Sequence, residues 1–286
     1  MYVGRFAPSP TGPLHFGSLV AALASWLDAR AAGGRWLVRI EDLDAPRTVP
    51  GAADDILRTL EGLGLGWDGE VAFQGRRAAR YRDALQRLET RTYWCACSRR
   101  EIADSSLGLA ADGAQIYPGT CRNGITPGKA RRALRIRASG SVEFTDRLQG
   151  RQHQLLEREV GDFVLHRADE QYAYQLAVVV DDAEQGVTDV VRGADLLDST
   201  PRQIYLQRLL DYPQPRYLHV PAAVNAAGEK LSKQTGAMPI DVSRRSGALR
   251  RALAFLGQAE TDDLAAAVRN WNAALIPARR ASAAVP

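Results

Sequence analysis

The order of apolar and polar residues in the first third of the chain predicts short strands that alternate with helices. Apolar runs at 3–6 and 35–40 have the length of buried strands. Between them, apolar residues recur with the helical period on one face: Phe16, Leu19, Val20, Leu23, Trp26 and Leu27. Gly33-Gly34 ends this helix, and further helices are predicted at 51–63 and 76–89. Strands and helices in this order predict a parallel sheet.

The pattern changes after residue 92 and resumes near residue 161. The intervening stretch, 93–160, carries small residues, turn signals and no long helix. Two short strands are predicted at 133–137 and 142–145, joined by Ser139-Gly140 as a hairpin. We therefore interpret 93–160 as an insertion into a domain formed by 1–92 and 161–225.

Further strands and helices are predicted in the rest of this domain. Residues 226–286 are interpreted as a loop followed by a C-terminal helical region. A strand at 162–165, a helix at 172–183, a strand at 188–192 and a last strand at 217–224 are predicted. Another helix begins at Thr200, with Thr200 as N-cap, Pro201 in the first turn and Gln203 completing a capping box. Two amphipathic helices are predicted at 247–255 and 262–275, and the tail from Ser282 to Pro286 is expected to fray.

Composition and charge set broad limits on the function. The 286 residues carry a net charge of +4, which permits nucleic acid as a partner without requiring it. No apolar run approaches the length of about 18 residues that a membrane span needs, and the chain begins at once with a strand, so we expect no secretory signal, no membrane partner and a cytoplasmic protein. Nothing in the sequence indicates more than a monomer.

The loop after the first strand has the features of an anion site. It leads directly into a helix whose start carries His15 and Gly17, so free backbone N–H groups and the positive end of the helix dipole face outward. It has neither the G-x-G-x-x-G spacing of a dinucleotide site nor the Gly-Lys-Ser/Thr of a Walker loop. A proline-rich turn with a capping histidine is the alternative.

A second loop, Lys230-Leu231-Ser232-Lys233, follows the last predicted strand. Two lysines three positions apart suit a polyphosphate, although an ordinary solvated basic loop has the same composition. The pairing of this loop with the His-x-Gly turn favours a nucleotide site.

These two loops resemble the signature loops of class I aminoacyl-tRNA synthetases, and the surrounding sequence is similar to the glutamyl branch. Five motifs occur in the family's order over nearly the whole chain to about residue 240. They are Arg5 to Gly12, His15 to Ser18, Val38 to Asp42, Val191 to Asp195 and Lys230 to Gln234. The first signature ends in Ser18 where the wider class has a second histidine, so no role for a second histidine carries over.

Within that branch the chain is most similar to the short members, which lack the anticodon-binding region. About fifty residues follow the second loop, too few for that region. The resemblance implies ATP-dependent activation of L-glutamate, with Mg²⁺ on the phosphates, and transfer to queuosine at the wobble position of tRNA(Asp). It also implies a Rossmann-type, doubly wound α/β fold with a zinc-containing insertion and a short C-terminal helical region.

The resemblance also implies a set of site residues. The glutamate site comprises Arg5, Phe6, Ala7, Pro8, Ser9, Glu41, Tyr174 and Arg192. The ATP site comprises His15, Gly17, Ser18, Lys230, Ser232 and Lys233, with His15, Lys230 and Lys233 catalytic. The chemistry agrees, because arginine pairs with carboxylate in a bidentate manner and a glutamate side chain can pair with an ammonium group. No general base is needed for a carboxylate already ionised at pH 7.

The cysteines form a candidate metal site within the insertion. The three cysteines of the chain, Cys95, Cys97 and Cys121, are an odd number without a signal peptide, which favours metal or free thiols over disulfides. A tetrahedral zinc site needs a fourth ligand. The resemblance implies Tyr117 in that place, whereas His153 is an alternative by chemistry. Such a zinc ion would be structural.

Three other functions remain open from the sequence. The first is a compact ligase that glutamylates a tRNA 3′ end, with the same site and another acceptor. The second is a synthetase-like protein that binds RNA and has lost catalysis, against which the retained loop lysines and pocket charges argue. The third is a small-molecule adenylyltransferase, which would not need a glutamate-shaped charge set.

Overall fold

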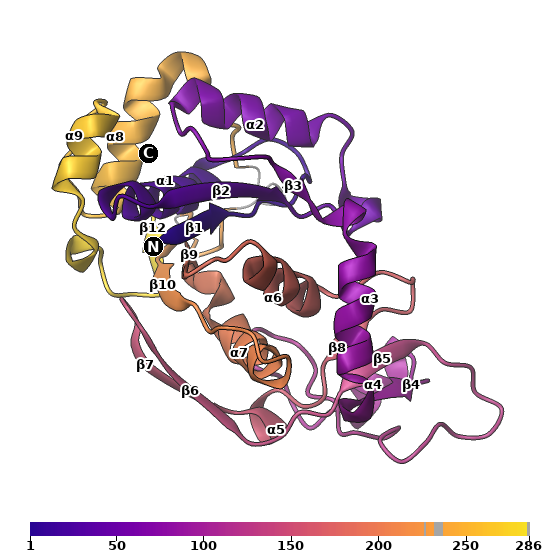
Figure 1. Cartoon of the computed structure of the whole chain (residues 1–286). Helices are drawn as coiled ribbons and strands as arrows, with labels where there is room; N and C mark the ends of the chain where they lie inside the picture. The colour runs from indigo at the N-terminus through magenta and orange to yellow at the C-terminus, as the bar shows by residue number, and fades with distance from the viewer. Residues whose placement is uncertain (226, 232–236, 285–286) are drawn as a thin grey trace.

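The computed structural model describes residues 1–225, 227–231 and 237–284, and its centre is a parallel sheet (Figure 1). Strands β1 (Val3–Phe6), β2 (Arg35–Ile40) and β3 (Ala72–Phe73) pair in parallel in that order. Strands β9 (Asp189–Gly193) and β10 (Arg216–Val220) form a second parallel pair. The Thr188 amide donates to the Val3 carbonyl at 2.9 Å, which sets β9 beside β1. The predicted parallel sheet is confirmed.

Helices cover both faces of this sheet, as a doubly wound fold requires (Figure 1). One face carries α1 (Phe16–Ala31), α2 (Ala52–Leu63), α8 (Arg245–Phe255) and α9 (Leu264–Asn270). The other carries α6 (Tyr174–Glu184) and α7 (Thr200–Leu209), with α3 (Ala78–Arg87) at its side. None of the described helices is long and apolar enough to cross a membrane.

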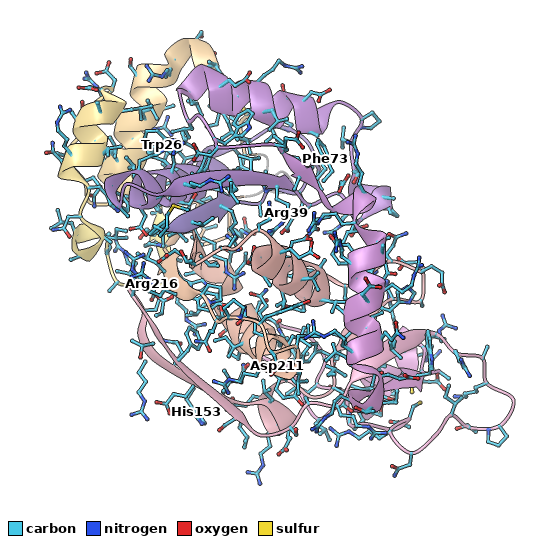
Figure 2. The ribbon with its side chains drawn as sticks, in the orientation of Figure 1. Trp26, Arg39, Phe73, His153, Asp211 and Arg216 are labelled. Carbon is cyan, nitrogen blue, oxygen red and sulfur yellow. The ribbon has the colours of Figure 1, made fainter. Side chains whose placement is uncertain are left out.

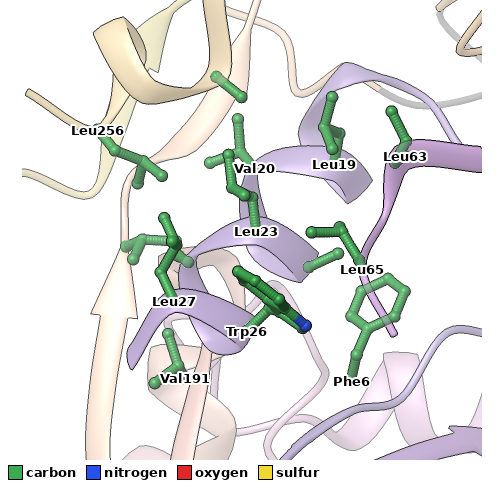
Figure 3. Packing of buried hydrophobic residues seen from close by; sticks show 14 of the residues in the cluster. Phe6, Leu19, Val20, Leu23, Trp26, Leu27, Leu63, Leu65, Val191 and Leu256 are labelled. Atoms are coloured by element: carbon green, nitrogen blue, oxygen red, sulfur yellow. The ribbon is translucent and has the colours of Figure 1, made fainter. Parts of the chain in front are cut away.

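Helix α1 forms the centre of the main hydrophobic core. Its predicted apolar face is buried between the sheet and the C-terminal helices, as Figure 3 shows for Leu19, Val20, Leu23 and Leu27. Phe6 of β1 and Val191 of β9 pack against α1 from the sheet side, and Leu256 packs from the end of α8. This packing fixes the first turn of α1, and the loop before it lies at the edge of the sheet.

The region predicted as an insertion forms an antiparallel sheet that extends to β8, which corrects two predictions. Strand β5 (Ala133–Ile136) pairs with β4 (Thr92–Cys95) and with β8 (Val164–His166), so β8 does not continue the parallel sheet. The predicted hairpin is also wrong, because β6 (Ser141–Asp146) pairs with β7 (Gly150–Leu155). Strand β7 is almost entirely polar and has no apolar alternation, so its pairing was invisible in the sequence. Short helices α4 (Arg99–Ser105) and α5 (Leu156–Glu159) flank these strands.

The start of α7 differs from its prediction. A 3₁₀ segment, Ala194–Ser199, runs straight into α7, and the position before the helix is Ser199 in helical conformation. Thr200 therefore does not cap the helix, and no capping box forms with Gln203. Both side chains instead contact the guanidinium group of Arg192.

The C-terminal part of the chain also differs from its prediction. The strand expected at 217–224 is divided into β10 and β11 (Ala222–Val224) at Pro221, which has no N–H to donate. Strand β11 pairs in parallel with β12 (Ala281–Ala283), so the tail was wrongly expected to fray from Ser282, which is buried. The helix expected at 262–275 is α9 followed by a 3₁₀ turn, Ala273–Leu275. Residues 285–286 lie outside the described part of the chain.

Candidate active site

A cleft of about 830 Å³ lies at the carboxyl ends of β1, β2 and β9, next to the start of α1. This edge is where parallel α/β sheets place ligands. The cleft is lined by the whole predicted glutamate set, Arg5, Phe6, Ala7, Pro8, Ser9, Glu41, Tyr174 and Arg192. It is also lined by His15, Gly17, Ser18 and Lys230 of the predicted ATP set. The structure therefore brings the glutamate set and the described members of the ATP set together in one cleft.

His15 organises the start of α1. It is the N-cap, and its Nδ1 accepts the Ser18 backbone N–H at 3.4 Å. A Cβ on Gly17 would lie 3.2 Å from the His15 ring, so glycine leaves the room that the ring occupies. The positive end of the α1 dipole faces the cleft and favours an anion there.

The described residues on either side of the second signature loop pair with two different segments. Lys230 pairs with Val224 across a turn, and Pro239 pairs with His15 in an isolated antiparallel bridge. The Lys230 Nζ lies 2.5 Å from the Asp195 carboxylate, at the mouth of the cleft. Ser232 and Lys233, predicted for the ATP site, lie outside the described residues.

A buried ionic cluster lies between the sheet and α6, beneath the part of the cleft that Arg5 and Glu41 line. Arg39 of β2 has no exposed side-chain surface and pairs with Asp182 at 2.7 Å, Glu41 at 3.3 Å and Asp181 at 3.7 Å. Figure 2 shows Arg39 between β2 and α6. Arg5 also pairs with Asp182, at 3.3 Å. The charges of Arg5 and Arg39 are thus balanced by carboxylates of the protein itself.

The pKa values of Asp182 and Glu41 in this cluster are shifted in opposite directions. Burial works to raise the pKa of Asp182, but the charges of Arg5 and Arg39 outweigh burial and hold it below its ordinary value. At Glu41 burial wins, and the pKa is raised although Arg39 and Arg5 act against it. The arginines therefore favour the ionised form of Asp182, and a further cation near Glu41 would favour its ionised form too.

Arg192 of β9 has a different environment. Its guanidinium group donates to His219 Nε2 at 3.0 Å, to Tyr174 Oη at 3.3 Å and to Thr200 Oγ1 at 2.9 Å. It also donates to the Gln203 Oε1 and the Leu196 carbonyl. All of these acceptors are neutral, and no described carboxylate forms an ion pair with Arg192, which is 5% exposed. A buried cation surrounded by neutral acceptors can bind an anion supplied by a ligand.

The three cysteines come together in the insertion and could hold a metal ion. Their sulfur atoms lie within 4.8 Å of one another, and Cys97 Sγ is 3.7 Å from Cys121 Sγ. The hydroxyl of Tyr117 lies 3.3 Å from Cys95 Sγ and 3.4 Å from Cys97 Sγ. Burial raises the pKa of Cys97 to about 11 in the absence of metal. His153 lies on β7, well away from β4 in the views of Figures 1 and 2, and is not part of this cluster.

Comparison with known protein families agrees with this arrangement. Residues 2–257 match the catalytic domain of the class I tRNA synthetases for glutamate and glutamine (E and Q). The chain belongs to this family. It is thus a class I aminoacyl-tRNA synthetase-like ligase, as its motifs predicted.

Two relatives of this synthetase illustrate the similarity. A glutamyl-Q tRNA(Asp) synthetase of Dechloromonas aromatica (strain RCB) is 62% identical over 267 residues, which cover 92% of this chain and 89% of the relative. A glutamyl-Q tRNA(Asp) synthetase of Verminephrobacter eiseniae (strain EF01-2) is 58% identical over 287 residues, covering 98% and 97%.

Solved structures of two synthetases share the fold. A glutamate tRNA ligase of Elizabethkingia meningosepticum CCUG26117, in complex with its amino acid, aligns with a TM-score of 0.81 at 23% identity, covering 99% of this chain and 67% of that chain. The glutamate-tRNA synthetase of Elizabethkingia anophelis aligns with a TM-score of 0.80 at 22% identity, covering 96% and 66%. The likeness confirms the predicted fold class, and this chain spans about two thirds of each structure's length.

Several residues of this synthetase's site were not identified from the sequence. They are Arg39, Asp181, Asp182, Asp195 and His219. A signal existed for three of them, because Arg39 interrupts an apolar strand and Asp181-Asp182 interrupt an apolar helix. Charges in buried elements need partners, and these charges are partners of one another.

Proposed function

We propose that this chain activates L-glutamate with ATP and transfers the glutamyl group to queuosine at the wobble position of tRNA(Asp). The acceptor is supported by relatives that align over nearly the whole chain and are named glutamyl-Q tRNA(Asp) synthetases. The amino acid is supported by the charges of the cleft. Glutamate, ATP and this tRNA are the partners that the proposal requires.

The observation that carries the amino-acid assignment is the state of Arg192. A carboxylate of glutamate supplies the anion that Arg192 lacks among the described residues, and its Nη1 retains an N–H beyond the one given to Tyr174. Glu41, whose pKa burial raises, is suited to the ammonium group. Arg5 lines the same cleft, where Asp182 fixes its position and balances its charge.

The activation step needs an oxygen nucleophile and a place for phosphate charge. The glutamate carboxylate attacks the α-phosphorus of ATP, the bond to the bridging oxygen breaks, and pyrophosphate leaves with the electron pair. His15, the start of α1 and Lys230 lie where they can bind the phosphates, and Ser232 and Lys233 are assigned to the same task by motif. Catalysis is then positioning and charge stabilisation, with no covalent enzyme intermediate.

We assign the cysteine cluster to one structural zinc ion with Tyr117 as the fourth ligand. Tetrahedral zinc with bonds of about 2.3 Å to sulfur separates neighbouring sulfurs by about 3.8 Å. The distance of 3.7 Å between the sulfur atoms of Cys97 and Cys121 is close to that value. Tyr117 places an oxygen beside two of the sulfurs and is itself buried. A zinc ion would join β4 to the loop that carries Cys121 and so hold the insertion together.

ATP–pyrophosphate exchange with each amino acid in turn tests the proposed activation. We expect exchange with glutamate and background exchange with glutamine and aspartate, which lack either the second carboxylate or the chain length. Exchange supported equally by other amino acids, or by none under any RNA condition, would contradict the assignment. Each assay is run with and without bulk tRNA, so that an RNA requirement for activation is detected.

A further inference from the structure

His219 and Asp146 form a buried pair directly behind Arg192. His219 lies on β10 with no exposed side-chain surface, and Asp146 ends β6 with none either. His219 Nδ1 is 2.6 Å from Asp146 Oδ2, and His219 Nε2 is 3.0 Å from Arg192 Nε. The three side chains therefore form one hydrogen-bonded chain that ends at the amino-acid end of the cleft.

The partners decide where the proton of His219 lies. Arg192 has only donors, so the Nε2 that faces it must accept. Asp146 Oδ1 already accepts the Leu148 and Gln149 amides, and its Oδ2 faces Nδ1. Nδ1 therefore carries the hydrogen and donates to Asp146. Burial lowers the pKa of His219 to about 4, which keeps the ring neutral at pH 7.

We propose that His219, oriented by Asp146, is a positioning residue that aims Arg192 at the substrate carboxylate while leaving the charge of Arg192 available. This inference rests on the proposed glutamate site. A neutral ring can take the Arg192 Nε–H without forming an ion pair, whereas Asp182 takes the Nε–H of Arg5 and neutralises it. The difference assigns the substrate's anion to Arg192.

The neighbours of Arg192 support this role. Gln203 presents its oxygen to Arg192 because its nitrogen donates to Gln175 Oε1 at 3.0 Å. Gln175 in turn donates to Ser199 Oγ at 3.1 Å. Gln203, like His219, is therefore a neutral acceptor of Arg192 that another side chain holds in one orientation. The hairpin of β6 and β7 contributes no residue to the glutamate set. It supplies Asp146, which orients His219.

Two variants of His219 separate positioning from packing. His219→Gln retains a neutral acceptor at the distance of Nε2, whereas His219→Asn reaches Asp146 and leaves Arg192 Nε without an acceptor. In glutamate-dependent ATP–pyrophosphate exchange, we expect His219→Asn to raise KM for glutamate about tenfold or more and KM for ATP less than about twofold. His219→Gln should recover most of the loss. Thermal unfolding of each variant confirms that it is folded.

A folded His219→Asn variant with the wild-type KM for glutamate, or with equal rises for both substrates, would overturn the inference. Exchange by the wild-type chain with glutamate separates this outcome from failure of the proposed function. ¹⁵N NMR of the wild-type histidine rings provides a second measurement that needs no variant. We expect His219 to be the neutral tautomer with hydrogen on Nδ1, and hydrogen on Nε2 would refute the proposed chain even where a variant does not fold.

Discussion

The Asp182 carboxylate on α6 accepts the Nη1–H of Arg39 on β2 at 2.7 Å, and neither side chain is more than 7% exposed. This contact joins the sheet to the helix on its opposite face, directly under the cleft. Breaking a buried ion pair costs more than its net contribution, because the remaining charge is left without a partner. The proposed glutamate end of the site thus rests on a charge balance that is internal to the protein.

Asp182→Asn should lower the free energy of unfolding by about 3–5 kcal/mol, since Arg5 and Arg39 both lose their shared anion. Urea denaturation measures the change. Asp169→Asn is the matched control, because Asp169 pairs with Arg167 on the surface and should cost about 1 kcal/mol or less. Equal effects of the two substitutions would show that the buried cluster has no special role.

Arg192→Ala should weaken glutamate binding about 10- to 100-fold, because a charge-assisted hydrogen bond to the carboxylate is lost. KM for ATP should change little. Arg216→Ala, on the neighbouring strand, removes an arginine that is 66% exposed and pairs with Asp189 away from the cleft (Figure 2), and should leave both constants near wild type. A similar loss for glutamate and ATP in Arg192→Ala would count against the pocket assignment.

Acid should destabilise the chain through His219. Its pKa falls from the usual 6.5 to about 4 on folding, chiefly through burial, so the unfolded chain binds a proton that the folded chain excludes between these values. The contribution of His219 to the free energy of unfolding is fully present above about pH 6.5 and is lost as the pH falls towards 4. Between pH 7 and pH 5 the loss is about 2 kcal/mol. Urea titrations should show this component in wild type and not in His219→Gln; identical pH dependence would be evidence against a neutral buried ring.

Cys97→Ala should abolish binding of about one zinc per chain and loosen the insertion, because three thiolates are needed with Tyr117 to complete the tetrahedron. Metal content by mass spectrometry and proteolysis of the 93–160 region measure the two effects. Ser98→Ala is the control: it removes the cap of α4, with its bond to Glu101, and leaves the ligands intact. Unchanged metal content in Cys97→Ala would exclude the site.

The sequence identified the elements that share a strong periodic pattern and the loops that carry motifs. Helix α1 and strands β1 and β2 follow from apolar spacing alone, and the described residues of the motif loops line one cleft. Polar β7 and short β12 have no such pattern, so their pairings depend on tertiary partners. The positions of Thr200 and Gln203 also depend on a tertiary partner. Their spacing fits a capping box, but both side chains instead accept hydrogen bonds from the buried Arg192.

The measurement that tests the central proposal most directly is transfer of labelled glutamate to purified tRNAs. The acceptors are tRNA(Asp) with and without queuosine, tRNA(Glu) and tRNA(Gln), each assayed before and after periodate treatment. The account predicts label on queuosine-containing tRNA(Asp) alone, lost when periodate opens the cyclopentene diol. Label on tRNA(Glu) or tRNA(Gln), or equal label on tRNA(Asp) without queuosine, would contradict the proposed acceptor and indicate a ligase that acts on tRNA 3′ ends.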